Sequence, residues 1–237
     1  MCTLTWWRDA AGTYEVFFNR DEKKTRTQAQ PPRVHERGGV SFLAPLDPDG
    51  GGTWMLANRM GVVVCLLNRW HEEDADEQPS RSRGQLVMEM GALENVPAVE
   101  ERLRREELNG VRPFTMVGFD PVGHRAWSWN GRSLRVERPE MPLCSSSYHF
   151  EEVAAARSQR FRELSCSERM GAGLLESFHG DLDPAGRATA LTTRMCRPDA
   201  QTMSRSRVLV RNGTVKWIYL EEQAELAGPP RLFEAAL

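Results

Sequence analysis

The segment Val62–Leu67, with the sequence Val-Val-Val-Cys-Leu-Leu, restricts the fold of this chain more than any other. An unbroken apolar run of this length, rich in β-branched residues, is typical of a strand that is covered on both faces. It extends to Asn68 and follows the strand pattern Thr53–Ala57, so that the two segments form a hairpin about Asn58–Gly61. The sequence therefore predicts a sheet that lies between other layers.

Further strand patterns occur on both sides of this hairpin. At the start of the chain, Leu4–Trp7 and Thr13–Asn19 form a hairpin with a short polar turn that contains Gly12. The other predicted strands are Val40–Ala44, Phe114–Phe119, Arg125–Trp129, Arg205–Val210 and Thr214–Leu220, the last two joined by the hairpin signal Asn212-Gly213. The polar segment Arg20–Arg37 contains Pro31 and Pro32 and is predicted as a long loop.

Helical periodicity occupies the middle of the sequence. Ser80 or Ser82 can cap a helix that carries Leu86, Val87, Met90 and Leu93 at spacings of three and four residues. The other predicted helices are Pro97–Leu108, Phe150–Leu164 and Leu174–His179. Strands at both ends, helices between them and mostly hairpin connections predict an α+β fold with largely antiparallel sheets.

Length and composition exclude several classes of protein. The 237 residues can form one sheet-based domain over 1–237, and the formal net charge of -2 provides no global field for nucleic acid. No apolar segment is long enough to span a membrane. The five cysteines are odd in number and lack the paired spacing of a disulfide framework, and charged residues precede any hydrophobic region of signal-peptide length. Both features predict a cytoplasmic protein.

Cys2 is the most informative candidate for chemistry. Initiator Met is generally removed before a small residue, which would place a thiol and an α-amine on one residue. The amine has an ordinary pKa near 7.7–8.0 and can take the proton of the neighbouring thiol without a histidine. The alternative is an ordinary buried small residue at the start of a strand.

The first hairpin places Cys2 beside residues 19 to 21, because the open ends of two antiparallel strands lie together. Arg20 could stabilise a thiolate and lower its pKa, and Asp21 could orient the α-amine. The alternative is a polar turn with a surface ion pair, which contributes little to stability.

Several short motifs recur here in the order of a known family. They are Met1-Cys2-Thr3, Asn19-Arg20-Asp21-Glu22, Gly51-Gly52-Thr53-Trp54 with Asn58, Leu66-Leu67-Asn68, Ser82-Arg83-Gly84 with Leu86, Pro113-Phe114 and Trp129-Asn130. As a set they resemble the NRDE family, which includes transport and Golgi organization protein 2. The resemblance extends over most of the chain.

That family in turn resembles N-terminal nucleophile (Ntn) hydrolases of the choloylglycine hydrolase and penicillin V acylase type. The resemblance implies an αββα four-layer sandwich in which Cys2 is the nucleophile, Arg20 stabilises the thiolate and Asp21 anchors the amine. It also implies that Asn68 donates to the oxyanion, although a strand-end cap is an equal reading of that residue. The residues expected to contact the substrate are Asn19, Glu22, Trp54, Asn58 and Arg207.

The sequence departs from the family pattern in two places. Ser145-Ser146-Ser147 stands where a Ser-Asn pair is common, so a second oxyanion amide is missing from its expected place. In the run Thr202–Arg207, either Arg205 or Arg207 could point inward, because a slip of one residue reverses the faces of a strand.

The proposed activity is hydrolysis of a linear C–N amide bond in a small molecule through an acyl-Cys2 intermediate, with no metal or organic cofactor. His71 with Glu72-Glu73-Asp74 could form a metal cluster, but consecutive acidic residues after a strand more often form a solvated loop. The alternative function is non-catalytic binding or trafficking of an apolar ligand such as haem or acyl-CoA. Its support is the missing amide, the thiol as an iron ligand, and Trp6, Trp7, Trp54 and Trp70, which could line a pocket or belong to the core.

Overall fold

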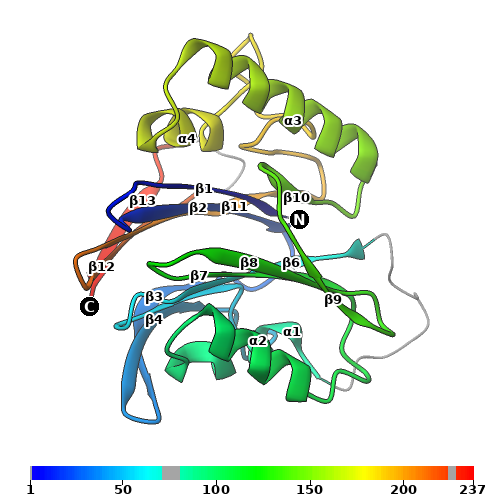
Figure 1. The fold of residues 1–237 in the computed structure, drawn as a ribbon. Helices are drawn as coiled ribbons and strands as arrows, with labels where there is room; N and C mark the ends of the chain where they lie inside the picture. The colour runs from blue at the N-terminus through cyan, green and yellow to red at the C-terminus, as the bar shows by residue number, and fades with distance from the viewer. Residues whose placement is uncertain (1, 71–80, 224–227) are drawn as a thin grey trace. The chain divides into compact units, whose positions relative to one another are not determined.

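The computed structural model describes residues 2–70, 81–223 and 228–237. The chain forms two compact units. The first contains Met1–Arg26, Glu140–Leu209 and Trp217–Glu234, and the second contains Thr27–Pro139, Val210–Lys216 and Ala235–Leu237. Each unit is built on an antiparallel sheet with helices against it, which confirms the predicted α+β class (Figure 1).

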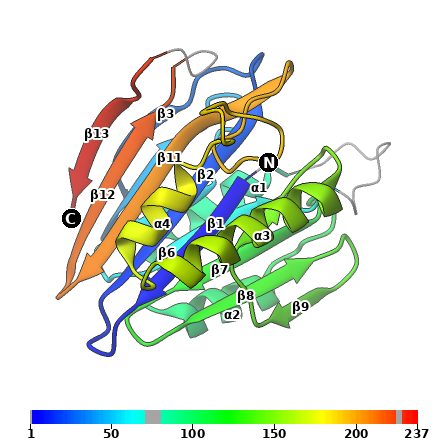
Figure 2. The same ribbon diagram turned by 90° about the horizontal axis from the view of Figure 1, so that it is seen from above.

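The first unit is built on a six-stranded sheet. Its strands are β1 (Cys2–Arg8), β2 (Tyr14–Lys23), β10 (Leu143–Ser145), β11 (Ala200–Arg211), β12 (Thr214–Glu221) and β13 (Arg231–Ala236). They are arranged in the order β10-β1-β2-β11-β12-β13. The helices α3 (Phe150–Ser167) and α4 (Ala172–His179) lie over this sheet, as Figure 2 shows from above.

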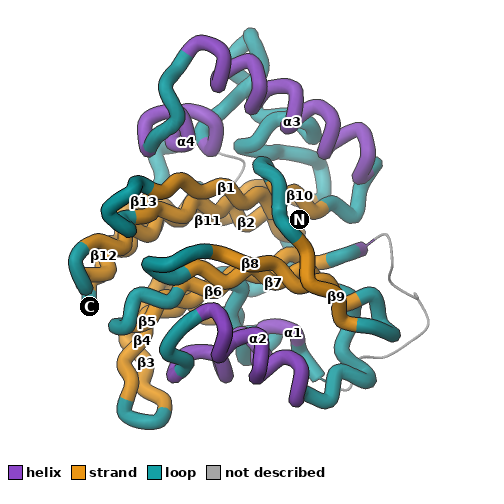
Figure 3. The backbone as a smooth tube through the Cα atoms, in the orientation of Figure 1, coloured by secondary structure: helices purple, strands orange, loops and turns teal. Residues whose placement is uncertain are grey.

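The second unit is built on a seven-stranded sheet in the order β3-β4-β5-β6-β7-β8-β9. Its strands are β3 (Gln30–Arg37), β4 (Val40–Leu46), β5 (Met55–Asn58), β6 (Val63–Asn68), β7 (Phe114–Phe119), β8 (His124–Trp129) and β9 (Leu134–Glu137). The helices α1 (Arg83–Glu89) and α2 (Val96–Arg105) and the 3-10 turn η2 (Met90–Ala92) pack against it, and Figure 3 shows α1 and α2 in purple beside its strands.

The central strand β6 has the burial that its sequence predicts. All residues of Val62–Leu67 are buried. Val62, Val64 and Leu66 alternate toward the helices and pack with residues such as Leu86 and Val87 of α1. Because alternate side chains of a strand point to opposite faces, the burial of the remaining residues means that neither face of β6 is exposed to solvent.

Two of the sequence motifs touch each other in this unit and explain their glycines. A Cβ atom on Gly52 would lie 2.2 Å from the backbone carbon of Gly84, and the Thr53 N–H donates to the Gly84 carbonyl at 3.1 Å. The Ser82 side chain caps α1 by accepting from the Gly84 N–H. The Gly51-Gly52-Thr53-Trp54 and Ser82-Arg83-Gly84 segments therefore form one close backbone contact that any larger residue at position 52 would disrupt.

One predicted loop is wrong. The segment Arg20–Arg37 contains the end of β2, a connection, and strand β3. Pro31 and Pro32 are tolerated because β3 is at the edge of its sheet and its pairing with β4 is irregular between Gln30 and Arg33. The sequence also did not indicate β9, β10 and β13, which are short or at an edge.

The remaining predicted elements are present with shifted ends. The hairpins at residues 4–19, 53–68 and 205–220 all form, although β11 begins earlier, at Ala200. Helix α2 ends at Arg105, three residues before the predicted end. The predicted cap Ser80 lies outside the described residues. Among the described residues, no helix is long and apolar enough to cross a membrane.

Candidate functional site

Strand pairing places Cys2 between two neighbours. In the β1–β2 hairpin Cys2 is opposite Arg20, as the sequence predicts, and in the β1–β10 pair it is opposite Ser145. Directly opposite residues of antiparallel strands share a face of the sheet. The thiol of Cys2 therefore lies on the same face as the side chains of Arg20 and Ser145, and the adjacent residues Thr3 and Asn19 point to the other face.

Cys2 is only 7% exposed, and this burial controls its acidity. Desolvation raises the pKa of the Cys2 thiol from 9.0 to about 11; the positive charges of the chain's N-terminus and of Arg20 oppose the rise, and the charge of Asp21 adds to it. Arg20 thus lowers the thiol pKa, as expected, but the effect of burial is larger. At neutral pH the thiol is protonated and needs a base before it can attack.

Arg20 and Glu22 form an ion pair on this same side of β2. Arg20 Nη2 lies 3.5 Å from Glu22 Oε2, and Arg26 Nε lies 3.8 Å from the same oxygen. Arg20 is 5% exposed, whereas Glu22 is partly exposed. Glu22 thus restrains the guanidinium that lies opposite the thiol.

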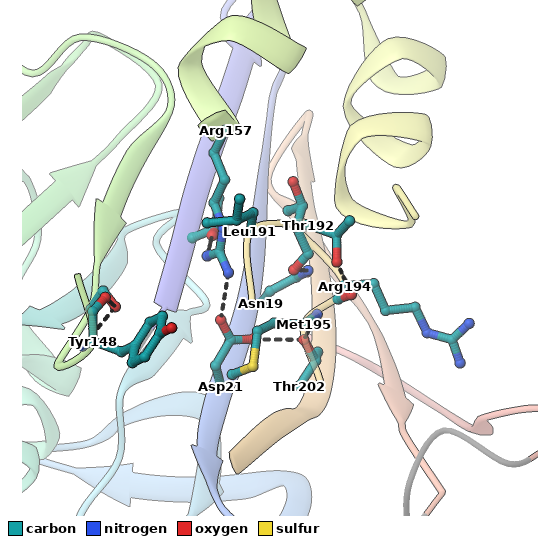
Figure 4. A network of polar contacts seen from close by, with 12 residues as sticks. Asn19, Asp21, Tyr148, Arg157, Leu191, Thr192, Arg194, Met195 and Thr202 are labelled. Carbon is teal, nitrogen blue, oxygen red and sulfur yellow. Dashed lines mark hydrogen bonds and ion pairs between the residues drawn. The ribbon is translucent and has the colours of Figure 1, made fainter. Parts of the chain in front are cut away.

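Asp21 points to the helix-covered face and is held from two sides (Figure 4). Arg157 Nη2 of α3 lies 3.3 Å from Asp21 Oδ2, and the Thr202 hydroxyl donates to Asp21 Oδ1 at 2.7 Å. Arg157 also donates to the hydroxyl of Thr3, the residue next to Cys2. Both side chains of the Asp21–Arg157 pair are 0% exposed. The carboxylate predicted to anchor the amine is therefore fixed by a buried ion pair.

Arg157 was missed from the sequence, although a signal for it exists. It lies four residues after Val153 and four before Phe161, and all three are buried on one side of α3. An arginine within the apolar stripe of a helix must find a partner for its charge, because burial of an unpaired charge is costly.

A second polar group on the helix-covered face joins β1 and β2 to α4. The Asn19 amide donates to the carbonyls of His179 and Thr193, both at 2.9 Å. Its oxygen must therefore accept from His179 Nδ1 at 2.7 Å, and the Thr5 hydroxyl donates to His179 Nε2 at 2.8 Å. Burial lowers the pKa of His179 to about 3, with Arg205 and Arg157 adding to the effect, so this imidazole is neutral.

The structure changes the reading of several predicted substrate contacts. Asn19 is 0% exposed and its amide is engaged as described. All four hydrogen-bonding positions of the buried Asn58 amide are used by Gly91, Leu93, Met60 and Val62. These two amides hold the chain's own backbone, and we leave them out of the proposed substrate contacts.

Arg207 is also not beside the thiol. It forms ion pairs with Glu15 and Glu176 and lies over the Phe17 ring, at 5.5 Å from the ring centroid. Glu15 and Phe17 alternate with Phe18 and Arg20 along β2, so Arg207 is on the face opposite Arg20. Arg205 is held by Glu222 at 2.6 Å and lies near His179. Neither Arg205 nor Arg207 therefore faces Cys2.

Asn68 and Trp54 belong to the second unit. Asn68 is the last residue of β6, opposite Phe114, and is partly buried. Trp54 is 7% exposed and precedes β5. The residues that could have formed a metal cluster, His71 and Glu72-Glu73-Asp74, lie outside the described residues. Within the described ranges no group of three His, Cys, Asp or Glu side chains could hold a metal ion.

Comparison with solved structures shows which fold this is. Two structures of the conjugated bile acid hydrolase from Clostridium perfringens, a mutant and a variant, match with TM-scores of 0.53 and 0.55 at 13% identity, over 99% and 98% of this chain and 96% and 92% of theirs. The Caenorhabditis elegans ortholog of N-acylethanolamine-hydrolyzing acid amidase matches with a TM-score of 0.53 at 10% identity, over 87% of this chain and 92% of that one. The chain therefore has an Ntn-hydrolase-like fold.

Sequence comparison identifies the family. No curated protein matches the chain at a significant level. The model of the family described as Transport and Golgi organisation 2 matches residues 1–161, which is more than half of the chain. The motifs around Cys2, Arg20, Gly52 and Gly84 all lie within this range, and the chain belongs to the Transport and Golgi organisation 2 family.

Proposed function

We propose that the chain is an N-terminal-cysteine amidohydrolase that cleaves a linear C–N amide bond through an acyl-Cys2 intermediate. The observation that carries the proposal is the strand register, which sets the Cys2 thiol opposite Arg20. The next residue along β2, Asp21, is held by its ion pair with Arg157. The names of the structural relatives, a bile acid hydrolase and an acid amidase, support hydrolysis as the class of reaction.

The protonated state of the thiol determines what the mechanism needs. With Met1 attached, the Cys2 thiol has a pKa near 11, is neutral at pH 7 and requires a base. Removal of Met1 would supply one as the α-amine of Cys2 itself, whose ordinary pKa is near 7.7–8.0. The proposal therefore requires Cys2 to be the first residue of the active chain, with Asp21 orienting the amine.

The reaction then proceeds in two steps, acylation of Cys2 and hydrolysis of the thioester. The α-amine takes the thiol proton, Sγ bonds to the amide carbon, and the carbonyl oxygen becomes negatively charged. Collapse of this intermediate breaks the C–N bond, and the leaving amine takes the proton. Water then hydrolyses the thioester to release the acid and restore the thiol. Arg20 opposes the effect of burial on the charged thiolate.

Intact-protein mass spectrometry tests this proposal. The purified chain is measured before and after brief exposure to an activated ester, 4-nitrophenyl acetate, at near-neutral pH. A mass without Met1 and one acetyl adduct that maps to Cys2 are expected. Cys166→Ser is the matched control, because Cys166 is a free, exposed thiol whose loss should leave the Cys2 adduct unchanged.

Two further results would decide against catalysis. Retained Met1 with an unreactive Cys2 contradicts the mechanism, as does hydrolysis that survives Cys2→Ser in a folded protein. Either result would favour the apolar-ligand alternative. A haem titration would then test it, through a Soret shift that disappears in Cys2→Ala.

A further inference from the structure

The side chain of Ser145 is a buried hydroxyl with no bonding partner. Ser145 is 3% exposed, and among the described residues no atom donates to or accepts from its Oγ. A buried polar group without a partner costs free energy, so it is uncommon and needs a reason. Its neighbour differs: the Ser146 hydroxyl donates to the Tyr148 carbonyl and accepts from the Tyr148 N–H at 3.0 Å.

The position of Ser145 suggests that reason. It is the direct partner of Cys2 across the β1–β10 pair, so its side chain shares the face of the thiol. Cβ atoms of such partners are about 4.5–5.5 Å apart. The residue before it, Cys144, is opposite Thr3 and lies near Arg157 on the other face, which fixes the orientation of β10.

We propose that the Ser145 hydroxyl donates a hydrogen bond to the oxyanion that forms when Cys2 is acylated. This inference rests on the proposed function. When Sγ bonds to a carbonyl carbon, the negative oxygen is two bonds from Sγ, within reach of a donor on the adjacent strand. A hydroxyl without another partner is free to turn its proton toward that oxygen and is already in place before the reaction. Ser145 would thus supply the donor that the missing amide would otherwise provide.

Two reagents separate this role from a general effect on the thiol. Acylation by 4-nitrophenyl acetate forms the Sγ–C bond, transiently places charge on the carbonyl oxygen and releases nitrophenolate. Alkylation by iodoacetamide displaces iodide from carbon and develops no oxyanion. A donor to the oxyanion affects only the first rate, whereas a donor to the thiolate affects both.

The experiment measures both rates at Cys2 in the chain without Met1. For Ser145→Ala we expect acylation to slow about 100-fold and alkylation to change by less than about twofold. Ser145→Thr keeps the hydroxyl and should retain most of the acylation rate. Ser146→Ala is the matched control and should leave the ratio of the two rates unchanged. The midpoint of thermal unfolding of Ser145→Ala should be equal to or above that of the unmodified protein, because an unpartnered hydroxyl is removed.

Each other outcome has a distinct meaning. Equal rates in Ser145→Ala and the unmodified protein overturn the role of Ser145 and leave the proposed function standing. An equal slowing of acylation and alkylation also overturns it, because the hydroxyl then acts on the thiolate. If the unmodified protein reacts with neither reagent at Cys2, the proposed function itself fails.

Discussion

The helix–sheet interfaces of the two units differ in chemistry. In the second unit, α1 and α2 cover the sheet with apolar side chains such as Leu86, Val87 and Val99, which pack with Trp127 of β8 in one cluster. In the first unit, the apolar cluster around Phe161 and Phe178 is smaller. It lies beside a buried group of polar side chains from three strands and two helices: Thr3, Thr5, Asn19, Asp21, Arg157, His179 and Thr202.

This difference shows that the first unit uses polar contacts, which add less to stability than apolar packing but fix the orientation of side chains. A buried ion pair such as Asp21–Arg157 is often no more stabilising than apolar side chains of similar size, because both charges lose their water. Hydrogen bonds, however, have direction, and an apolar contact does not. The polar interface fixes the ends of β1 and β2, where Cys2 and Arg20 lie, whereas the apolar interface of the second unit only needs to exclude water.

The largest expected effect comes from breaking the buried pair of the first unit. Asp21→Asn leaves the 0% exposed Arg157 side chain without its carboxylate. We expect a loss of about 3–5 kcal/mol in the free energy of unfolding, measured in urea. Arg157→Met should lose a similar amount, and the double variant should recover most of it. Losses below about 1 kcal/mol in both single variants would contradict the comparison.

A cavity in the apolar interface should lower the free energy of unfolding by nearly as much, without changing its pH dependence or the reactivity of Cys2. Leu86 is 0% exposed, and Leu86→Ala should lower the free energy of unfolding by about 2–5 kcal/mol. Because no titratable group is removed, this loss should be equal at pH 5 and pH 8. Iodoacetamide labelling of Cys2 under native conditions should remain unchanged. A pH-dependent loss would mean that the two interfaces are not chemically distinct.

The polar interface should also make stability depend on acid. The pKa of His179 is about 3 in the folded chain and near 6.5 when unfolded, so the unfolded chain binds this proton first. Stability from neutral His179 is complete above pH 6.5 and falls by about 1.4 kcal/mol for each pH unit below it. At pH 5 the loss is about 2 kcal/mol.

Urea unfolding between pH 7 and pH 5 measures this effect as the difference in slope between the unmodified protein and His179→Gln. The exposed His149 supplies the control, since His149→Gln should keep the steeper slope. The same slope in all three proteins would show that His179 is not held neutral by the fold.

The smallest effect is expected at the exposed surface of α2. Arg105 and Glu101 form an i,i+4 pair in which both side chains are mostly exposed. Glu101→Gln should change the free energy of unfolding by less than about 0.5 kcal/mol. Salt up to 0.5 M should remove even this difference. A larger change would indicate that charge placement matters outside the buried polar interface as well.

Much of the fold was predictable because it rests on local patterns. Val62–Leu67 is a strand by composition, and Asn212-Gly213 forms its turn because both residues adopt positive φ, at 50° and 74°. The charge run in α2 was predicted as surface pairing, and Glu100–Arg104 and Glu101–Arg105 confirm it. Strand β3 was missed because its prolines argue against a central strand and sequence gives no sign that a segment lies at an edge.

The candidate site was only partly predictable. The hairpin alone brings Cys2 to Arg20, since antiparallel register follows from turn and strand length. It does not show that burial outweighs Arg20 in setting the thiol pKa, because burial depends on the segments that cover the strand. The sequence also left open whether Arg205 or Arg207 points inward, because the face of each side chain depends on the pairing of β11 within the sheet.

The sequence by itself determined the strand and helix segments, the family, and the juxtaposition of Cys2 with residues 19 to 21, all of which depend on neighbours in the chain. Tertiary structure decided that Arg157 from α3 holds Asp21 and that Ser145 from β10 faces Cys2, at separations of 136 and 143 positions along the chain. The physical reason is that charge pairing and hydrogen bonding act over a few ångströms in space, and only the packed fold brings such distant residues within that range.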